Sequence, residues 1–65
     1  MREAAGEKLR MLRKKKKKTQ EEVAADLGIS ASSWSMYEQG ERVPRDELKI
    51  RIAAYFGKSV AYIFF

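Results

Sequence analysis

Two helix boundaries stand almost side by side near the middle of the chain, and they restrict the possible folds more than any other feature. Gly28 can take the left-handed conformation that ends a helix, and Ser30 can cap the next helix only two residues later. Ile29 and Trp34 flank this cap with the spacing of a hydrophobic staple. The sequence therefore predicts two helices that meet at a tight turn and cross at a fixed angle.

Glycine, proline and capping residues divide the whole chain into short segments with helical periodicity. Thr19 and Glu22 are spaced as a capping box, and neither sustained alternation nor an Asn-Gly or Asp-Gly dipeptide predicts a strand. We therefore expect one all-α domain over residues 1–65. Its five predicted helices cover about residues 4–15, 19–27, 30–39, the segment from just after Pro44 to Gly57, and a last short helix capped by Ser59.

The absence of Cys and His from the 65 residues limits the chemistry that the chain can perform. Disulfides, thiol nucleophiles, imidazole bases and the common zinc spacings are all excluded. A chain of this length buries only about 60% of the surface that its unfolded form exposes, so a deep pocket is not expected. Asp46 and Glu47 are best explained by the positive end of a helix dipole. We expect no enzyme, and no metal, cofactor or small-molecule ligand.

Positive charge gathers at the amino-terminal end. Residues 1–18 hold nine basic and two acidic side chains, whereas residues 19–65 hold five basic and seven acidic ones, and the net charge is +5. Such a basic field favours an acidic partner, either nucleic acid or an anionic membrane surface. The apolar runs are much shorter than the roughly 18 residues that span a bilayer, and no signal-peptide core is present. A cytoplasmic protein is therefore expected. A membrane partner is not expected, because the predicted helices are short and capped and no broad apolar face lies opposite the basic one.

The predicted third helix has one large buried side and one small, almost uncharged side. Trp34, Tyr37 and Glu38 fall on the first side. Four residues share the second side: Ser32, Ser35, Met36 and Gln39. Because 35% of all residues are charged, an exposed face without Lys or Glu favours close approach to another surface, such as the major groove of DNA. The alternative is an ordinary solvent-exposed face. Two helices joined by a short turn containing glycine are the architecture of a helix-turn-helix.

Several spaced elements of the sequence occur together in an order that is specific. They are Leu12-Arg13, Thr19-Gln20-Glu21-Glu22-Val23-Ala24, Leu27-Gly28-Ile29-Ser30, Ser33, Tyr37-Glu38-Gln39-Gly40, Arg42, Pro44 and Leu48. From about Ala5 to Phe65 the chain resembles the lambda-repressor-like, Xre/Cro type of helix-turn-helix domain. The resemblance implies a compact five-helix bacterial or phage regulator that binds double-stranded DNA. Residues 19–27 would lie over the DNA backbone, and residues 30–39 would be the recognition helix in the major groove.

The resemblance also implies roles for individual residues. Arg13 and Glu38 match an ion pair between the first helix and the recognition helix. The positions that touch base edges in relatives are matched by Ala31, Ser32, Ser35 and Met36. Side chains of these types read bases weakly, so direct readout should be modest. The candidates for phosphate contacts are Gln20, Gln39, Arg42, Lys17, Lys18 and the hydroxyl of Tyr37. For Gln20 the position at a helix N-terminus supports the same role. The alternatives are a solvated lysine run and a Gln20 that is only compatible with a helix.

Two departures from the family pattern affect the expected geometry and assembly. Lys17 stands where relatives usually have glycine, so we expect the first helix to run longer or to fray there, because a left-handed lysine costs about 1 kcal/mol. The apolar end of the chain, with Tyr62, Phe64 and Phe65, predicts an interface for a homodimer. The leading hypothesis is a repressor on a pseudo-palindromic operator. The alternative is an antitoxin-like interaction module of the same fold with secondary DNA binding.

Overall fold

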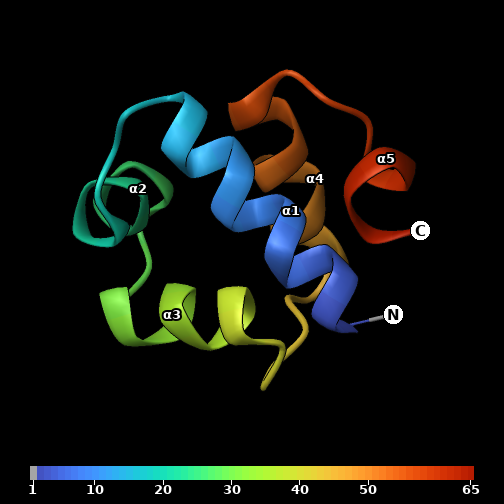
Figure 1. The fold of residues 1–65 in the computed structure, drawn as a ribbon, viewed down its shortest axis with the longest axis horizontal. Helices are drawn as coiled ribbons and strands as arrows, with labels where there is room; N and C mark the ends of the chain where they lie inside the picture. Colours follow the sequence, from blue (N-terminus) through green and yellow to red (C-terminus); the bar gives the residue numbers. More distant parts are fainter. Residues whose placement is uncertain (1) are drawn as a thin grey trace.

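The computed structural model describes the backbone of residues 2–65 and the side chains of residues 4–65, so the charges of Arg2 and Glu3 counted above lie outside the described side chains. The described residues form five helices and include no strand (Figure 1). The helices are α1 (Arg2–Lys15), α2 (Gln20–Leu27), α3 (Ala31–Gln39), α4 (Asp46–Phe56) and α5 (Val60–Phe64). The prediction of an all-α fold with five helices is confirmed, and α1 begins two residues earlier than expected.

The helix boundaries follow from the local capping signals. The Glu22 amide donates to the Thr19 hydroxyl at 3.1 Å, and the Thr19 amide donates to the Glu22 carboxylate at 2.9 Å, which completes the capping box. Gly28 takes a φ of 72°, and Ser30 caps α3 by accepting from the Ser33 amide at 3.0 Å. The turn between α2 and α3 is therefore as short as the sequence predicts, because only Gly28 and Ile29 separate the last residue of α2 from the cap of α3.

The turn between α1 and α2 corrects one expectation. The first helix neither runs longer nor frays, because it ends at Lys15 and Lys17 takes the left-handed conformation with a φ of 59°. The Lys18 amide donates back to the Arg13 carbonyl oxygen at 3.3 Å, and the Arg13 guanidinium donates to the Lys18 carbonyl oxygen at 3.0 Å. These contacts hold the turn in the shape that glycine would favour, at a cost of about 1 kcal/mol for the lysine.

The core forms where the five helices meet around Trp34. This side chain is fully buried and packs edge-on against Tyr37, with 6.4 Å between the ring centroids. It also packs against Phe56 in a tilted arrangement, with 6.2 Å between the ring centroids. The other fully buried large side chains are Leu9, Val23, Ile52 and Ile63. Leu48 and Phe56, which the apolar pattern predicts to be buried, are only half-buried at the edge of this core.

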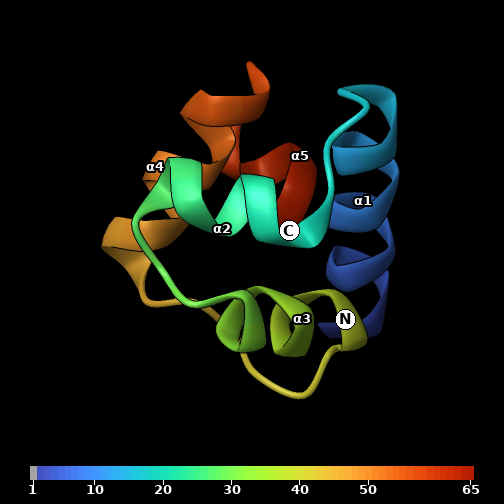
Figure 2. The ribbon, with the colours of Figure 1, turned by 90° about the vertical axis from the view of Figure 1, so that its left-hand side faces the viewer.

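The arrangement of the helices leaves α3 at one end of the domain. In both ribbon views α3 lies at the bottom beside the amino-terminal part of α1, whereas the carboxyl-terminal ends of α1 and α4 lie at the top (Figure 1, Figure 2). The Cα atoms span 25 × 23 × 21 Å. Within the described part of the chain, no helix has both the length and the apolar character that crossing a membrane requires.

Candidate nucleic-acid interface

The two sides of α3 differ as the sequence predicts. Trp34, Tyr37 and Glu38 are buried against the rest of the domain. On the other side Ser32 and Gln39 are exposed, and Ser35 and Met36 are half-buried. Ala31 is also half-buried and packs against the core, so its methyl group is less free to meet a base than the outward side chains are. The outward surface of α3 is thus short, uncharged and free of bulky side chains.

Hydrogen bonds order the polar side chains along this surface. The Gln39 amide nitrogen donates to the Ser35 hydroxyl oxygen at 3.2 Å, and the Ser30 hydroxyl donates to Ser33 at 3.0 Å. The Ser35 hydroxyl keeps its own proton, and Gln39 keeps its carbonyl oxygen and one amide proton, for a further partner. Both residues therefore present donor and acceptor groups in a defined orientation, which is what readout of base edges or sugar-phosphate oxygens requires.

A buried carboxylate ties the inner side of α3 to the two preceding helices. Glu38, which is only 3% exposed, accepts from Arg13 Nε at 2.6 Å and Nη2 at 3.2 Å. It also accepts from Trp34 Nε1 at 2.5 Å and from Gln20 Nε2 at 3.0 Å. Arg10 lies further out, with its Nε 3.7 Å from the carboxylate. The carboxylate thus fixes the orientation of α3 relative to α1 and to the start of α2.

The same contacts set the charge state of Glu38. Burial opposes ionisation, but the hydrogen bonds from Arg13, Gln20 and Trp34 outweigh it and hold the pKa of Glu38 below its ordinary value. The carboxylate is therefore ionised at neutral pH, and every buried polar side-chain atom of the described residues has a hydrogen-bond partner. Removing one partner would leave a buried charge without compensation.

Gln20 lies at the first position of α2, where the sequence predicts a phosphate contact. Its side-chain amide points toward the domain and donates one proton to Glu38, which leaves the other proton and the carbonyl oxygen available. Neither this contact nor the one from Trp34 to Glu38 is predicted from the sequence. The spacing of four residues between Trp34 and Glu38 on one helix face is a signal that could have revealed the second contact, whereas the contact between Gln20 and Glu38 depends on the packing of α2 on α3.

Two members of the lysine run gather around Asp26 and Tyr55. Lys18 pairs with Asp26 of α2, with 3.3 Å between Nζ and Oδ2, and Asp26 also accepts from the Tyr55 hydroxyl at 2.6 Å. The Nζ of Lys16 lies 4.9 Å from the ring centroid of the same Tyr55, whereas Lys17 is exposed at the turn. Of the two lysines predicted to meet phosphates, only Lys17 is thus without a partner among the described side chains.

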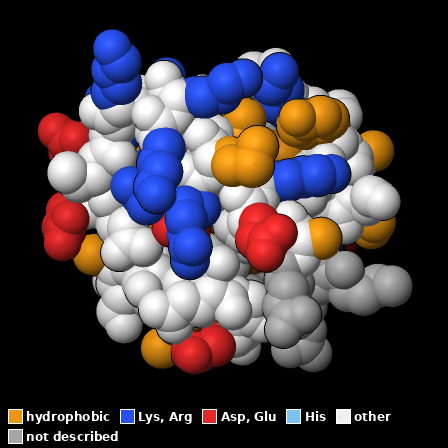
Figure 3. All heavy atoms as spheres, viewed as in Figure 1, with side chains coloured by type: hydrophobic (Ala, Val, Ile, Leu, Met, Phe, Trp, Pro, Cys, Tyr) orange, Lys and Arg blue, Asp and Glu red, His pale blue; other side chains and the backbone are white. Residues whose placement is uncertain are grey.

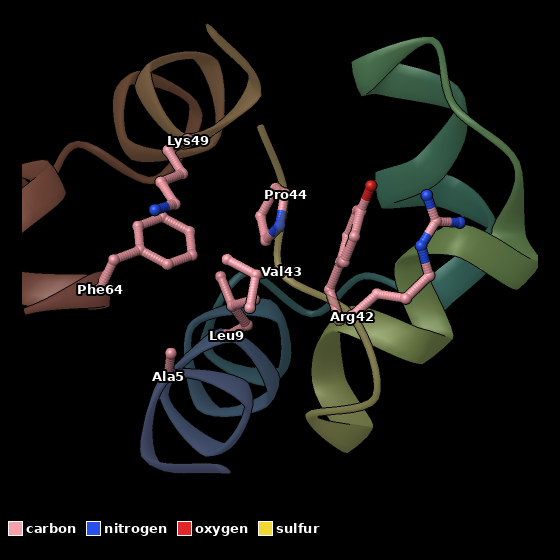
Figure 4. A pocket seen from close by; sticks show the side chains of 8 residues that line it. Ala5, Leu9, Arg42, Val43, Pro44, Lys49 and Phe64 are labelled. Carbon is pink, nitrogen blue, oxygen red and sulfur yellow. The ribbon is translucent and has the colours of Figure 1, made fainter. Parts of the chain in front are cut away.

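Arg42, just beyond the end of α3, lies beside Tyr37 in the last turn of that helix. The Arg42 guanidinium stands 5.9 Å from the centroid of the Tyr37 ring, while Tyr37 itself is only 7% exposed. Figure 4 shows Arg42 reaching away from a hollow lined by Leu9, Val43 and Pro44. The Arg42 charge therefore faces the solvent near the exit of α3, and Tyr37 serves mainly as a buried support for it.

The three residues predicted to form a dimer interface differ in exposure. Phe65 is 87% exposed and Tyr62 is 49% exposed, whereas Phe64 packs partly against the core. Lysines accompany all three rings: Lys8 and Lys58 lie over Tyr62, and Lys49 lies over Phe64 and Phe65.

In the part of the chain that the structure describes, no group of three or more acidic, His or Cys side chains is placed to hold a metal ion.

A short turn between α2 and α3, an outward surface on α3 without charge, and a polar network that fixes α3 together define a helix-turn-helix protein of the DNA-binding class. The model of a family described as a helix-turn-helix domain matches residues 4–61, and the chain belongs to this family. The match agrees with a lambda-repressor-like domain over nearly the whole chain. No curated protein and no solved structure matches the chain.

Proposed function

We propose that the chain is a sequence-specific transcriptional regulator, most simply a repressor that occludes a promoter by binding double-stranded DNA. The observation that supports this function most is the outward surface of α3, which carries no charge. Ser32, Ser35 and Gln39 offer polar groups there, and Met36 offers an apolar side chain. A helix of this kind can enter the major groove and approach the base edges. Ala31 and Met36 can meet only a thymine methyl, and serine reads little alone, so base readout is modest.

The proposed contacts with the DNA backbone surround α3. The free amides at the start of α2, together with Gln20, favour a phosphate there, because helix N-termini attract anions. Arg42 and Gln39 would bind the backbone beyond the end of α3, with the Tyr37 hydroxyl and Lys17 as further contacts. The Lys18 ammonium would first have to leave Asp26, so its contribution is smaller.

The proposed active form is a homodimer on a pseudo-palindromic operator. One recognition helix covers only a few base pairs, and related proteins place two of them about 34 Å apart, one turn of DNA. A domain of 25 Å fits within this spacing when two copies meet through Tyr62, Phe64 and Phe65. In this proposal the protein acts as a binding module in the cytoplasm, without a catalytic residue, cofactor, metal or small-molecule ligand.

Selection of bound sequences from random duplex DNA tests the function. A single enriched motif with two-fold symmetry is expected. If no sequence is enriched, the protein binds DNA nonspecifically through its positive charge. Replacing Ser32, Ser35 and Met36 together with Ala should relax the preference at a few base positions, each by about 1 to 3 kcal/mol. An unchanged motif would exclude these residues from readout.

If the dimer neutralises about 6 to 10 phosphates, the affinity should fall by roughly 10³ to 10⁵ between 50 and 200 mM salt.

A further inference from the structure

A shallow groove lies between the carboxyl-terminal ends of α1 and α4. Leu12 and Phe56 form its floor, and Lys15, Lys16 and Lys58 form its rim. The hollow measures about 230 Å³, which suits one or two side chains of a partner better than an enclosed ligand. We refer to these five residues as the lysine-rimmed groove.

The charge around the groove is of one sign. Lys15, Lys16 and Lys58 are exposed, and none of them forms an ion pair with a carboxylate of the described side chains. Asp26 accepts from the Tyr55 hydroxyl and from Lys18, and it is near enough to Lys16 to interact with its charge. The groove thus combines an apolar floor with three cations that have no ion-pair partner among the described side chains, and no acidic residue lines it.

The lysines are held near aromatic rings at the edge of the groove. The Lys16 Nζ lies 4.9 Å from the Tyr55 centroid, and the Lys58 Nζ lies 5.3 Å from the Tyr62 centroid. Such cation-π contacts orient an ammonium group without neutralising it. Figure 3 shows that Lys and Arg side chains lie next to hydrophobic ones on the face of the molecule seen in Figure 1.

From this surface we propose that the lysine-rimmed groove is a docking site for an acidic amphipathic segment of a partner protein. Apolar side chains of the segment cover Leu12 and Phe56, and its carboxylates pair with the three lysines. A second copy of the chain is proposed above to pair through Tyr62, Phe64 and Phe65 instead, and its net charge of +5 does not complement the three lysines of the groove. A DNA backbone offers phosphates but nothing that covers the apolar floor.

The position of the groove makes simultaneous binding possible. The ends of α1 and α4 lie at the opposite end of the domain from α3 in both ribbon views (Figure 1, Figure 2). A partner in the groove therefore leaves the outward surface of α3 free. The proposal does not depend on the regulatory role of α3, since it rests only on the charge and shape of the groove.

The test uses a synthetic helical peptide that carries glutamates on one face and leucines on the other. A scrambled peptide of the same composition, with both residue types on all faces, is the control for charge alone. Nuclear magnetic resonance of the labelled chain should show shifts at the Leu12 methyl groups and the Phe56 ring with the amphipathic peptide only. A preformed complex with duplex DNA should bind the same peptide with unchanged affinity.

Two charge-reversal variants separate the groove from the overall field. Lys15→Glu with Lys58→Glu should weaken peptide binding about tenfold or more, because two close pairs become repulsive. The control Lys14→Glu with Arg45→Glu changes the net charge equally at exposed positions outside the groove and should weaken binding much less. All four positions are exposed, so folding should persist.

Several outcomes would overturn the proposal. Equal binding of the scrambled peptide, or an equal loss of peptide affinity in the two variants, would show that the peptide binds through the overall positive charge and not in the groove. Shifts of Leu12 and Phe56 with duplex DNA alone would make the groove a nucleic-acid surface, and the same shifts with phosphatidylserine vesicles would make it a membrane surface. The same shifts on raising the protein concentration alone would assign the groove to a second copy.

Discussion

Gly6 in α1 lies directly against the main-chain carbonyl group of Glu38 at the end of α3. A β-carbon at position 6 would collide with the Glu38 carbonyl oxygen and would lie 2.9 Å from the Tyr37 carbonyl oxygen. Both obstacles are backbone atoms, so they cannot move aside as a flexible side chain can. Helix α1 therefore approaches α3 this closely only because residue 6 has no side chain, and the close approach brings Arg13 to the Glu38 carboxylate.

The change Gly6→Ala should destabilise the domain by about 1 to 3 kcal/mol, because the added methyl group overpacks the contact between α1 and α3. The sign is informative, since alanine in an unobstructed helix would stabilise by about 1 kcal/mol. Urea unfolding followed by circular dichroism measures the change. Glu7→Ala, at an exposed position of the same helix, is the control and should be nearly neutral. A stabilised Gly6→Ala variant would show that the two helices can separate at no cost.

The change Glu38→Gln should lower the free energy of unfolding at neutral pH by about 3 kcal/mol, because Arg13 loses its buried partner. The pKa of Glu38 is held below its ordinary value of 4.5, so the stabilisation by the carboxylate is complete above that value. It is lost as the pH falls through the lower pKa of the folded state.

Wild type and Glu38→Gln should therefore converge in stability toward acidic pH. Unfolding by urea at several pH values between neutral and strongly acidic measures the difference. Asp26, whose pKa is also lowered, first by the Tyr55 hydroxyl and then by Lys18, is present in both proteins and cancels in the comparison. A constant difference between the two proteins over the whole range would exclude the ionised carboxylate as its source.

The sequence predicts those parts of the fold that depend on neighbouring residues. The caps at Thr19 and Ser30 and the end of α2 at Gly28 are decided within one turn of helix, so residue type and spacing are enough. The two sides of α3 follow equally from helical periodicity. The contact of Gly6 with Glu38 does not follow from residue type or spacing, because it depends on a helix far away in the sequence.

The candidate interface divides in the same way. The outward position of Ser32 and Gln39 follows from periodicity, but the contact of Gln20 with Glu38 requires the packing of α2 on α3. The lysine run is a similar case: five identical residues give no pattern, and only the left-handed turn at Lys17 directs Lys16 toward Tyr55 and Lys18 toward Asp26. The direction in which each lysine side chain of the run points therefore cannot be predicted from the sequence.

The change Lys17→Gly should stabilise the domain by about 0.5 to 1 kcal/mol, because glycine takes the left-handed conformation without strain. Lys14→Gly, within the last turn of α1, should instead destabilise by a similar amount. Thermal unfolding of both variants measures the contrast. If Lys17 contacts a phosphate, Lys17→Gly should also flatten the salt dependence of DNA affinity by about one unit of slope. Destabilisation by Lys17→Gly would contradict the geometry of this turn.

The changes Gln20→Ala and Arg42→Ala should weaken binding to operator and random duplexes alike, because phosphate contacts carry no sequence information. Fluorescence anisotropy with both duplexes measures the ratio of affinities, which should stay near that of the wild type. Ser32→Ala is the matched comparison and should reduce this ratio. Loss of operator affinity with unchanged random binding would instead assign Gln20 or Arg42 to base readout.

The change Phe65→Ser should weaken homodimerisation, because it removes the most exposed large apolar side chain, which is 87% accessible in the single chain. Lys49 lies 5.4 Å from the Phe65 ring and 5.6 Å from the Phe64 ring, so a two-fold contact brings lysines of both copies close together. Salt screens this repulsion and should therefore strengthen the dimer, while it weakens DNA binding.

Sedimentation over a range of protein and salt concentrations measures how the substitution and the salt change dimerisation. Met11→Ser, which removes another exposed apolar side chain from outside this end of the domain, is the control and should leave the dimer intact. A monomer at high concentration, or a dimer that is indifferent to the loss of Phe65, would contradict this interface.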